Sequence, residues 1–453
     1  MGGEGASRLV HAVSLDAPYS RLALLVACTL ACTPAPARRA APALAPTAAP
    51  AQSPVVVAVD TAVLPSSPAP VACGTDGWTT YAHDAARTSA SGSCLHTPLV
   101  RSWTFSPPSR GGRGARVAHA VVDGDAVYAS GTLGDSPSVW KLDSLTGDAA
   151  WSFDSRADIA HRMWPTLAPR TVLLVDDGIF LIDPRAGKNR GRELDVWGES
   201  LTDGTSLFVM NTWQADGLGP YVGALDLDGH ALWRRDLLRH GRGYRPPDVG
   251  GVALADGTLV HASNQAQRGA HVAGFDVATS QKRWWRETTT PESSPSIAMA
   301  PEARILMVER WLGSKVDRLV ARSLKTGEVA WSDEMTAVRG PAPVVAGGRV
   351  IVHGEHGLVA LDVATGERRW SSPLGRTTPV SQSTTTIAVA LGSGVLAVCA
   401  GAEVHVLSLE DGHKQWAGEA APGARSVDSP VIAGGALYVV VDGAVVRLAG
   451  GAE

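Results

Sequence analysis

The chain has 453 residues, of which 45% are hydrophobic and 19% are charged, and its formal net charge is −4. This balance is that of a globular protein, and the lack of a basic excess argues against a nucleic acid or an anionic membrane surface as partner. Tryptophan (14) outnumbers phenylalanine (5) and tyrosine (6) together, and glycine (49) and proline (29) are abundant. We therefore expect many short strands and turns, with tryptophan in a particular packing role.

The first 32 residues are predicted to be a secretory signal with a lipid-attachment site. Arg21 precedes the apolar run LALLVACTLAC, which is too short to span a bilayer, because a spanning helix needs about 20 apolar residues. The run resembles a bacterial lipoprotein lipobox, in which a cysteine is lipidated. Cys28 fits that pattern better, whereas Cys32 leaves a more usual apolar length. The alternative is an ordinary cleaved signal with incidental cysteines.

Residues 33–72 are rich in alanine and proline and have no apolar periodicity, so they are predicted to form a semi-extended linker. The folded part is predicted to begin at Cys73 and to run to residue 453. Secretion implies an oxidising compartment, in which a disulfide between Cys73 and Cys94 is expected. Cys399 lies in the apolar run GVLAVCAG and is expected to be a buried, unpaired thiol.

From Cys73 onward, short β-branched runs alternate with turn residues, and residues 341–370 form the clearest unit. This unit divides into four strands, PVVA, RVIVH, LVALD and ERRW. In its last turn, LDVATG, Asp362 is expected to accept hydrogen bonds from turn amides, Thr365 to add another, and Gly366 to take the left-handed conformation. The motif LDVATGERRW therefore predicts a hairpin.

The same unit recurs along the chain with a period in the forties, and most copies end in a tryptophan. Four strands per copy at this period predict a β-propeller. A weak copy at about 164–195 lacks the tryptophan, and seven blades would follow if it were not a blade. The last copy supplies three strands, and LVRSWTF at 99–105 supplies the missing fourth, which closes the ring as an eighth blade. The tryptophans expected to cover the seams between blades are Trp103, Trp151, Trp233, Trp284, Trp331, Trp370 and Trp416.

This repeat, with its split closing blade, resembles the PQQ-like (quinoprotein-type) β-propeller family. The stretch DGWTTYAHDAARTSASG also resembles the usual lead-in to these propellers. One branch of the family contains dehydrogenases that bind pyrroloquinoline quinone (PQQ) and calcium in the central channel. Another contains lipid-anchored scaffolds, typified by the lipoprotein of the outer-membrane β-barrel assembly machine. The chain lacks the adjacent cysteine pair and the large insertions of the first branch, and it matches the second in length, lipobox, linker and blade number.

The loops that precede the innermost strands are the candidate binding region, because in a propeller they converge at the channel mouth. Arg162, Trp164, Arg245 and Arg339 would give this mouth a cationic, partly aromatic character, although solvated loop arginines are the plainer interpretation. His353 and His356 in HGEHG are assigned to a hairpin turn. They have no further ligands at a zinc spacing, so no metal site is predicted.

From the residues and the resemblance together, we expect a non-catalytic lipoprotein of the bacterial cell envelope, anchored in the outer membrane and facing the periplasm. It would be a protein-binding scaffold whose partners are other envelope proteins, with a role in outer-membrane protein assembly and without a cofactor. The alternative is a quinoprotein-type oxidoreductase or another small-ligand-binding propeller that uses PQQ and calcium.

Overall fold

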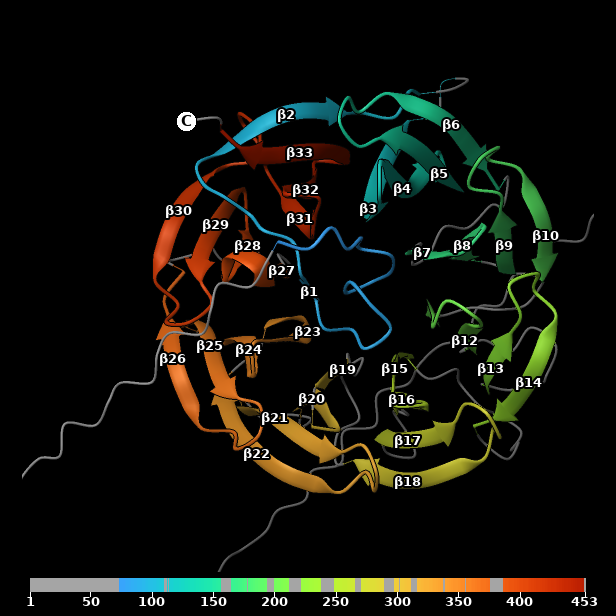
Figure 1. Ribbon diagram of the computed structural model, residues 1–453, viewed down its shortest axis with the longest axis vertical. Helices are drawn as coiled ribbons and strands as arrows, with labels where there is room; N and C mark the ends of the chain where they lie inside the picture. The colour runs from blue at the N-terminus through green and yellow to red at the C-terminus, as the bar shows by residue number, and fades with distance from the viewer. Residues whose placement is uncertain are drawn as a thin grey trace, which may run out of the picture. The chain divides into compact units, whose positions relative to one another are not determined.

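A computed structural model describes the compact unit that includes residues 73–451. The described residues are 73–109, 112, 114–155, 164–176, 178–193, 199–211, 221–237, 248–264, 270–288, 297–300, 302–310, 316–336, 339–354, 356–374 and 386–451. Cys28, Cys32, Arg162 and Arg245 lie outside them. The described residues form eight sheets arranged as a ring, which confirms the predicted eight-bladed propeller (Figure 1).

Blades 1 to 4 are antiparallel meanders whose first strand lies nearest the centre of the ring (Figure 1). Blade 1 contains β3 (Ala115–Asp123), β4 (Ala126–Leu133), β5 (Ser136–Asp143) and β6 (Ala149–Asp154). Blade 2 contains β7 (Pro165–Ala168), β8 (Thr171–Asp176), β9 (Gly178–Ile182) and β10 (Asn189–Glu193). Blade 3 contains β11 (Ser200–Thr202), β12 (Leu207–Asn211), β13 (Tyr221–Leu225) and β14 (Ala231–Asp236). Blade 4 contains β15 (Asp248–Ala255), β16 (Thr258–Asn264), β17 (Ala270–Asp276) and β18 (Lys282–Thr288).

Blades 5 to 7 repeat this order, and blade 8 closes the ring. Blade 5 contains β19 (Ile297–Ala300), β20 (Arg304–Arg310), β21 (Val316–Ser323) and β22 (Val329–Thr336). Blade 6 contains β23 (Arg339–Ala346), β24 (Arg349–Gly354), β25 (Gly357–Asp362) and β26 (Arg368–Ser372). Blade 7 contains β27 (Thr386–Ala390), the 3₁₀ turn η1 (Leu391–Ser393), β28 (Val395–Ala400), β29 (Glu403–Ser408) and β30 (Lys414–Glu419). Blade 8 contains β31 (Val427–Ala433), β32 (Ala436–Val441), β33 (Ala444–Gly450) and the N-terminal β2 (Leu99–Phe105).

The weak copy at 164–195 is a complete four-stranded sheet, so the seven-bladed alternative is wrong. The closing strand is also where it was predicted, since β2 pairs antiparallel with β33. Strand burial follows position in the blade. The middle strands are buried on both faces, as in β32 (ALYVVV), because adjacent blades pack against each side. Outer strands such as β30 (KQWAGE) are exposed except for alternate residues.

The predicted hairpin chemistry of LDVATG is present in blade 6. The Asp362 carboxylate accepts hydrogen bonds from the amides of Ala364 (2.9 Å) and Thr365 (3.0 Å). Gly366 has φ 77°, in the left-handed region. The Arg369 guanidinium, together with these turn amides, lowers the pKa of Asp362 to about 2, so the carboxylate is charged at neutral pH.

Tryptophans of the outer strands bridge neighbouring blades. Each indole N–H in this group donates to a carbonyl in the turn between the third and fourth strands of the next blade, over 2.8–3.1 Å. The pairs are Trp103 with Ser144, Trp151 with Pro184, Trp233 with Val277, Trp284 with Leu324, Trp331 with Val363 and Trp370 with Leu409. Trp416 packs against the core shared with blade 8, whose third and fourth strands are not joined by such a turn.

Blade 2 lacks this tryptophan, and a different residue makes the equivalent bond. The Thr171 hydroxyl, on the second strand of blade 2, donates to the Leu227 carbonyl of the next blade's turn over 3.3 Å. Leu181 approaches the same turn, since a Cβ added to Gly229 would lie 2.6 Å from a Leu181 methyl. The seam between blades 2 and 3 is thus closed by aliphatic contact and a hydroxyl in place of an indole.

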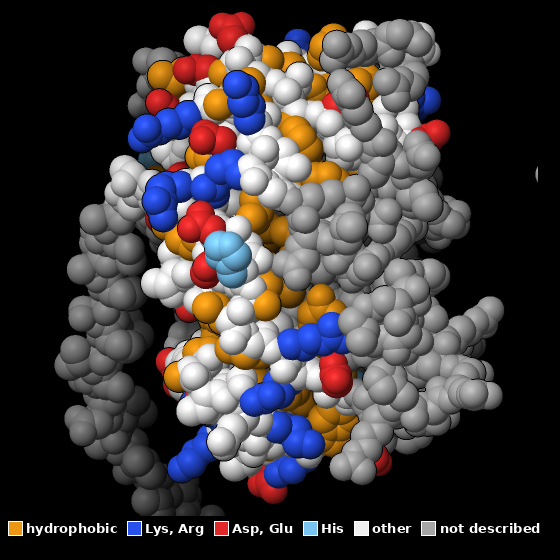
Figure 2. Space-filling view, turned by 90° about the vertical axis from the view of Figure 1, so that its right-hand side faces the viewer, with side chains coloured by type: hydrophobic (Ala, Val, Ile, Leu, Met, Phe, Trp, Pro, Cys, Tyr) orange, Lys and Arg blue, Asp and Glu red, His pale blue; other side chains and the backbone are white. Residues whose placement is uncertain are grey.

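Several charged side chains on the outside of the ring form pairs of opposite sign. Examples are Arg190 with Asp228 and Arg234 with Asp236. On the side that carries β10 and β14, Lys and Arg side chains are interspersed with Asp and Glu (Figure 2). Such exposed pairs contribute little stability. They leave no large patch of one sign among the described residues of this side, in keeping with the small net charge.

Candidate functional site

The lead-in segment fills the centre of the ring. Residues 74–93, here called the plug, cross the space enclosed by the eight innermost strands (Figure 1). Trp78 and Val122 exchange two backbone hydrogen bonds, of 2.6 and 2.8 Å. Inner-strand amides of five further blades donate to plug carbonyls over 2.7–2.9 Å: Leu167, Leu254, Met299, Val345 and Val389. Within the plug, β1 (Ala90–Ser91) pairs parallel with β27.

Arg87 ties the plug to blade 3, which the described backbone hydrogen bonds of the plug do not reach. Its side chain is 1% exposed, and its guanidinium donates to the carbonyls of Tyr81 (2.6 Å), Ser200 (2.8 Å) and Val252 (3.1 Å). The Glu199 carboxylate lies 3.8 Å from the same guanidinium. Burial lowers the pKa of Arg87, and Glu199 opposes that shift. With these contacts the plug is bonded to blades 1 to 7.

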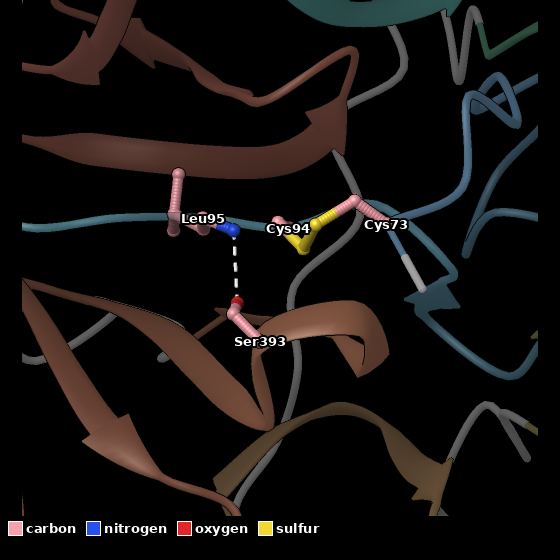
Figure 3. The surroundings of a disulfide bond; sticks show 4 residues. All are labelled: Cys73, Cys94, Leu95 and Ser393. Carbon is pink, nitrogen blue, oxygen red and sulfur yellow. Dashed lines mark hydrogen bonds between the residues drawn. A yellow bond between two sulfur atoms is a disulfide. The ribbon is translucent and has the colours of Figure 1, made fainter. Parts of the chain in front are cut away.

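A disulfide joins the two ends of the plug. Cys73 and Cys94 are bonded to each other, with their Cα atoms 5.1 Å apart (Figure 3). The Leu95 amide then donates to the Ser393 hydroxyl over 2.8 Å, which holds the exit of the plug against the first turn of blade 7. This turn lies on the face of the ring that carries the turns between first and second strands, which we call the turn face. The opposite face, reached by the start of each innermost strand, is called the loop face.

Above the plug, a pocket opens toward the loop face. Its floor is formed by Trp78, Tyr81, Ala82 and Ser89 of the plug. Blades 6, 7 and 8 provide the walls through Ala342, Val344, His353, Thr386, Ile387, Ser429, Pro430 and Val431, and Trp164 of blade 2 completes the lining. The empty space amounts to about 560 Å³, part of it open to solvent.

An aromatic cluster forms one side of the pocket. The Trp164 indole stacks on the His119 imidazole, with ring centroids 3.4 Å apart and an interplanar angle of 21°. The Tyr81 ring lies 4.5 Å from Trp164 on a tilted plane. The His119 Nδ1 is 3.3 Å from the Ser429 hydroxyl, so a hydrogen bond links blades 1 and 8 across the seam. The cluster is therefore held by three separate parts of the chain.

The inner strand of blade 8 is irregular where it meets the pocket. Ser429 has φ 52°, an unusual conformation for a residue other than glycine, and the register of β31 shifts between Asp428 and Val431. The Ser429 amide donates to the Asp428 carboxylate over 2.7 Å. Burial raises the pKa of Asp428, although the hydrogen bonds of its carboxylate with the Ser429 amide and the Thr386 side chain oppose the shift. The bulge turns the Ser429 side chain toward the channel.

The described lining carries no Lys, Arg, Asp or Glu side chain. Its polar groups are the hydroxyls of Ser89, Thr386 and Ser429, the imidazole of His353, and the polar atoms of its aromatic residues. Calcium takes six to eight oxygen ligands, mainly from carboxylates and carbonyls, and a quinone with carboxylate groups needs cationic partners. The described lining therefore does not fit PQQ with calcium.

One group of potential metal ligands occurs among the described residues, but its two cysteines form the disulfide. Cys73, Cys94 and His96 lie together, but the two sulfur atoms are bonded to each other. A thiolate is required for metal binding, so this group is not a metal site in the oxidised protein. The free thiol of Cys399 is buried, as predicted, and burial raises its pKa well above the usual value.

The residues predicted at the channel mouth are only partly brought together. Trp164 lines the pocket. Arg339 begins β23, and its side chain lies outside the described part, as do the whole of Arg162 and Arg245. The assignment of His353 to a turn is wrong, because it lies in β24, is 7% exposed and lines the pocket. Sequence reasoning also missed Tyr81, although the lead-in pattern was a usable signal for it.

A second pair of histidines is buried within blade 4, away from the pocket. His261 and His271 are 1% and 4% exposed, and their ring centroids are 5.3 Å apart. The His271 ring also stacks on Trp285, with centroids 3.9 Å apart. Burial lowers the pKa of His271 to about 4 and that of His261 well below its usual value, so both rings are neutral at pH 7.

Comparison with known proteins agrees with the ring architecture. Residues 268–451 match the model of the PQQ_2 family, described as outer membrane protein assembly factor BamB. This match confirms the predicted PQQ-like repeat over that range. No curated protein sequence matches the chain.

Solved structures with a similar fold come from unrelated functional settings. A europium-containing methanol dehydrogenase aligns with a TM-score of 0.58 and 13% identity, over 81% of this chain and 89% of the other. The computationally designed protein Ika8 aligns with a TM-score of 0.56 and 13% identity, over 75% and 98%. BamB from Moraxella catarrhalis aligns with a TM-score of 0.42 and 17% identity, over 78% and 99%. The first two likenesses establish the fold. Among the described residues, no helix has the length and apolar character needed to cross a membrane.

Proposed function

We propose that this chain, a propeller that matches the BamB family model over residues 268–451, is a non-catalytic scaffold that binds other envelope proteins through its loop face. The observation that carries the proposal is the plug. It fills the centre of the ring on the side of the turn face, so the propeller offers a pocket with a floor formed by the plug in place of an open central channel. Assistance to outer-membrane protein assembly is the concrete version of this role.

The N-terminal segment supports the envelope location. The lipobox-like run that contains Cys28 and Cys32, followed by the Ala/Pro-rich linker, is the arrangement of a tethered lipoprotein. The linker is followed in the sequence by Cys73, whose disulfide partner Cys94 directly precedes the Leu95 contact with the turn face. We therefore propose attachment to the outer membrane through a lipid, with the ring in the periplasm.

The alternative function, quinoprotein-type oxidation, is favoured by the likeness to a methanol dehydrogenase fold alone. Fold does not decide function, and the described lining, which has no Lys, Arg, Asp or Glu, argues against the anionic cofactor and its calcium. No reaction step is derived for it.

Two measurements separate these functions. The purified protein is incubated with PQQ and calcium, and binding is followed by the visible absorption of the quinone and by calorimetry. We expect no saturable binding, and stoichiometric binding would refute the scaffold proposal. In parallel, the tagged full-length chain is cross-linked in envelopes and purified under stringent washing. Recovery of the same partner in every preparation is the expected result.

Lipid attachment is tested with labelled palmitate. The wild-type chain should incorporate the label, and one of the two variants Cys28→Ser and Cys32→Ser should lose it while the other keeps it. Each variant serves as the matched control for the other. Equal labelling of both variants would refute a single lipidated cysteine at these positions.

A further inference from the structure

We infer that the central pocket is the receptor for one uncharged apolar side chain, such as leucine, proline or phenylalanine, that projects from a loop of the partner protein. This inference rests on the proposed scaffold function and names the chemistry of the contact. It is argued from the preformed floor, the charge of the lining and the size of the space.

The floor of the pocket is preformed. The Trp78 amide and carbonyl are both bonded to Val122 of β3, and the Arg87 guanidinium donates to the Tyr81 carbonyl over 2.6 Å. The disulfide between Cys73 and Cys94 closes the plug into a loop. A residue that enters this pocket therefore does not have to order the floor. Because that entropy cost is absent, a single buried contact can contribute strongly to affinity.

The lining selects against charge. Trp78, Tyr81 and Trp164 present aromatic surface, and Ala342, Ile387 and Val431 present aliphatic surface. A charged group that entered would lose its water without meeting an opposite charge among the described lining residues, and such a transfer is strongly unfavourable. Neutral hydroxyl groups of Thr386 and Ser429 stand in the wall, where the backbone of an entering loop could meet them. The occupant is therefore apolar and uncharged, with hydrogen-bonding groups behind it.

The size of the space sets the size of the occupant. Most of the roughly 560 Å³ of empty space is too narrow for a water-sized group, and only a small central part of it admits one. That is the space of one side chain. The described floor and walls would surround that side chain.

The first experiment uses small probes on the folded chain. N-acetyl-leucinamide and N-acetyl-phenylalaninamide represent the inferred side chains, and N-acetyl-lysinamide and N-acetyl-aspartic acid α-amide are the charged counterparts. Methyl β-glucoside tests a neutral sugar as a rival occupant. Binding is followed by saturation-transfer NMR and located by crystal soaking.

The variant Ala342→Phe fills the pocket with a ring from its wall. Ala364→Phe is the matched control, because it makes the same change on an exposed turn of the opposite face. Thermal unfolding verifies that both variants fold. We expect the apolar amides to bind the wild-type chain and Ala364→Phe at least tenfold more tightly than they bind Ala342→Phe or than the charged amides bind wild type. Equal binding of charged and apolar probes, or preference for the sugar, would overturn the inference. If Ala342→Phe fails to fold, the location of the probe in wild-type crystals decides the question.

The same three proteins are then used in the envelope cross-linking experiment. Loss of the partner with Ala342→Phe alone supports the inference. Capture of the same partner by all three proteins overturns it and leaves the scaffold function standing. Failure of all three to capture a partner, even with binding of the apolar probes, refutes the scaffold function and with it the inferred protein occupant.

Discussion

The contact between Gly366 and Trp331 provides a quantitative test of how the blades are held together. A Cβ added to Gly366 would lie 2.7 Å from two atoms of the Trp331 ring, and Gly366 has φ 77°. The variant Gly366→Ala therefore introduces two costs, left-handed backbone strain and a steric conflict across the seam. The ring cannot move away freely, because its indole N–H is bonded to the Val363 carbonyl over 3.0 Å.

Gly401→Ala separates these two costs. Gly401 has φ 66°, but an added Cβ would meet nothing within 4 Å. Gly401→Ala should therefore lower the free energy of unfolding only by the strain contribution, about 1–2 kcal/mol. Gly366→Ala should lower it by about 1–3 kcal/mol more, because of overpacking, and so by about 2–5 kcal/mol in all. For a unit of this size, 1 kcal/mol corresponds to roughly 1 °C in Tm, from the entropy of unfolding per residue. We thus expect Tm to fall by about 2–5 °C in Gly366→Ala and by about 1–2 °C in Gly401→Ala.

Differential scanning calorimetry measures both variants and the double variant Gly366→Ala with Trp331→Leu. The smaller leucine side chain should relieve the conflict across the seam, so the two substitutions together should cost less than the sum of their separate effects. Equal Tm losses in the two glycine variants, together with additive effects in the double variant, would refute a tight tryptophan-to-glycine seam.

Three further predictions concern buried polar groups and the plug. His271 has a pKa of about 4 in the folded chain, below its unfolded value near 6.5, so the unfolded state binds the proton and stability falls as pH drops from about 6.5 to 4. The loss from this residue is about 3 kcal/mol, and His271→Phe should flatten the dependence of Tm on pH in that window; an unchanged slope would contradict the assignment. Replacing both Cys73 and Cys94 by serine should lower stability by about 3 kcal/mol in denaturant titrations, while the same change at Cys399 serves to show what a buried thiol alone contributes. Arg87→Met should cost about 3–5 kcal/mol in the same titrations, because it removes the cation beside Glu199 and the donor to three carbonyls, two of them buried. A loss below 1 kcal/mol would mean that the plug is not anchored by this residue.

The ring could be predicted from the sequence because each blade repeats one local rule. The turn that contains Asp362, Thr365 and Gly366 depends only on residues close together in the chain, and a tryptophan that follows it at fixed spacing reaches the next blade's copy of the same turn. Even the split closing blade could be recognised, since Trp103 stands in a lone strand that matches the missing fourth. Blade 2 is the exception. There the donor is Thr171, which lies on the second strand and not on the outer one, so the spacing that locates the tryptophans does not locate it.

The pocket could not be predicted in the same way. Tyr81, Trp164, His353 and Ser429 come from the plug and from three different blades, and no sequence spacing relates them. Their meeting depends on the path of the plug through the ring and on the bulge in β31. The HGEHG motif illustrates the difficulty, because its first histidine is the end of a buried strand and its second belongs to the turn.

The pairing of β2 with β33 also means that the first blade strand of the chain stays unpaired until the last one has been made. During synthesis β2 emerges before every other blade strand, yet its partner is the last strand of the ring to be made. A chain that stops anywhere before blade 8 leaves β2 without its pairing strand, so Val100 and Trp103 lie on an unpaired edge of the kind that promotes aggregation and attracts chaperones and proteases. Truncated chains are thereby distinguished from finished ones by a local defect at their opposite end.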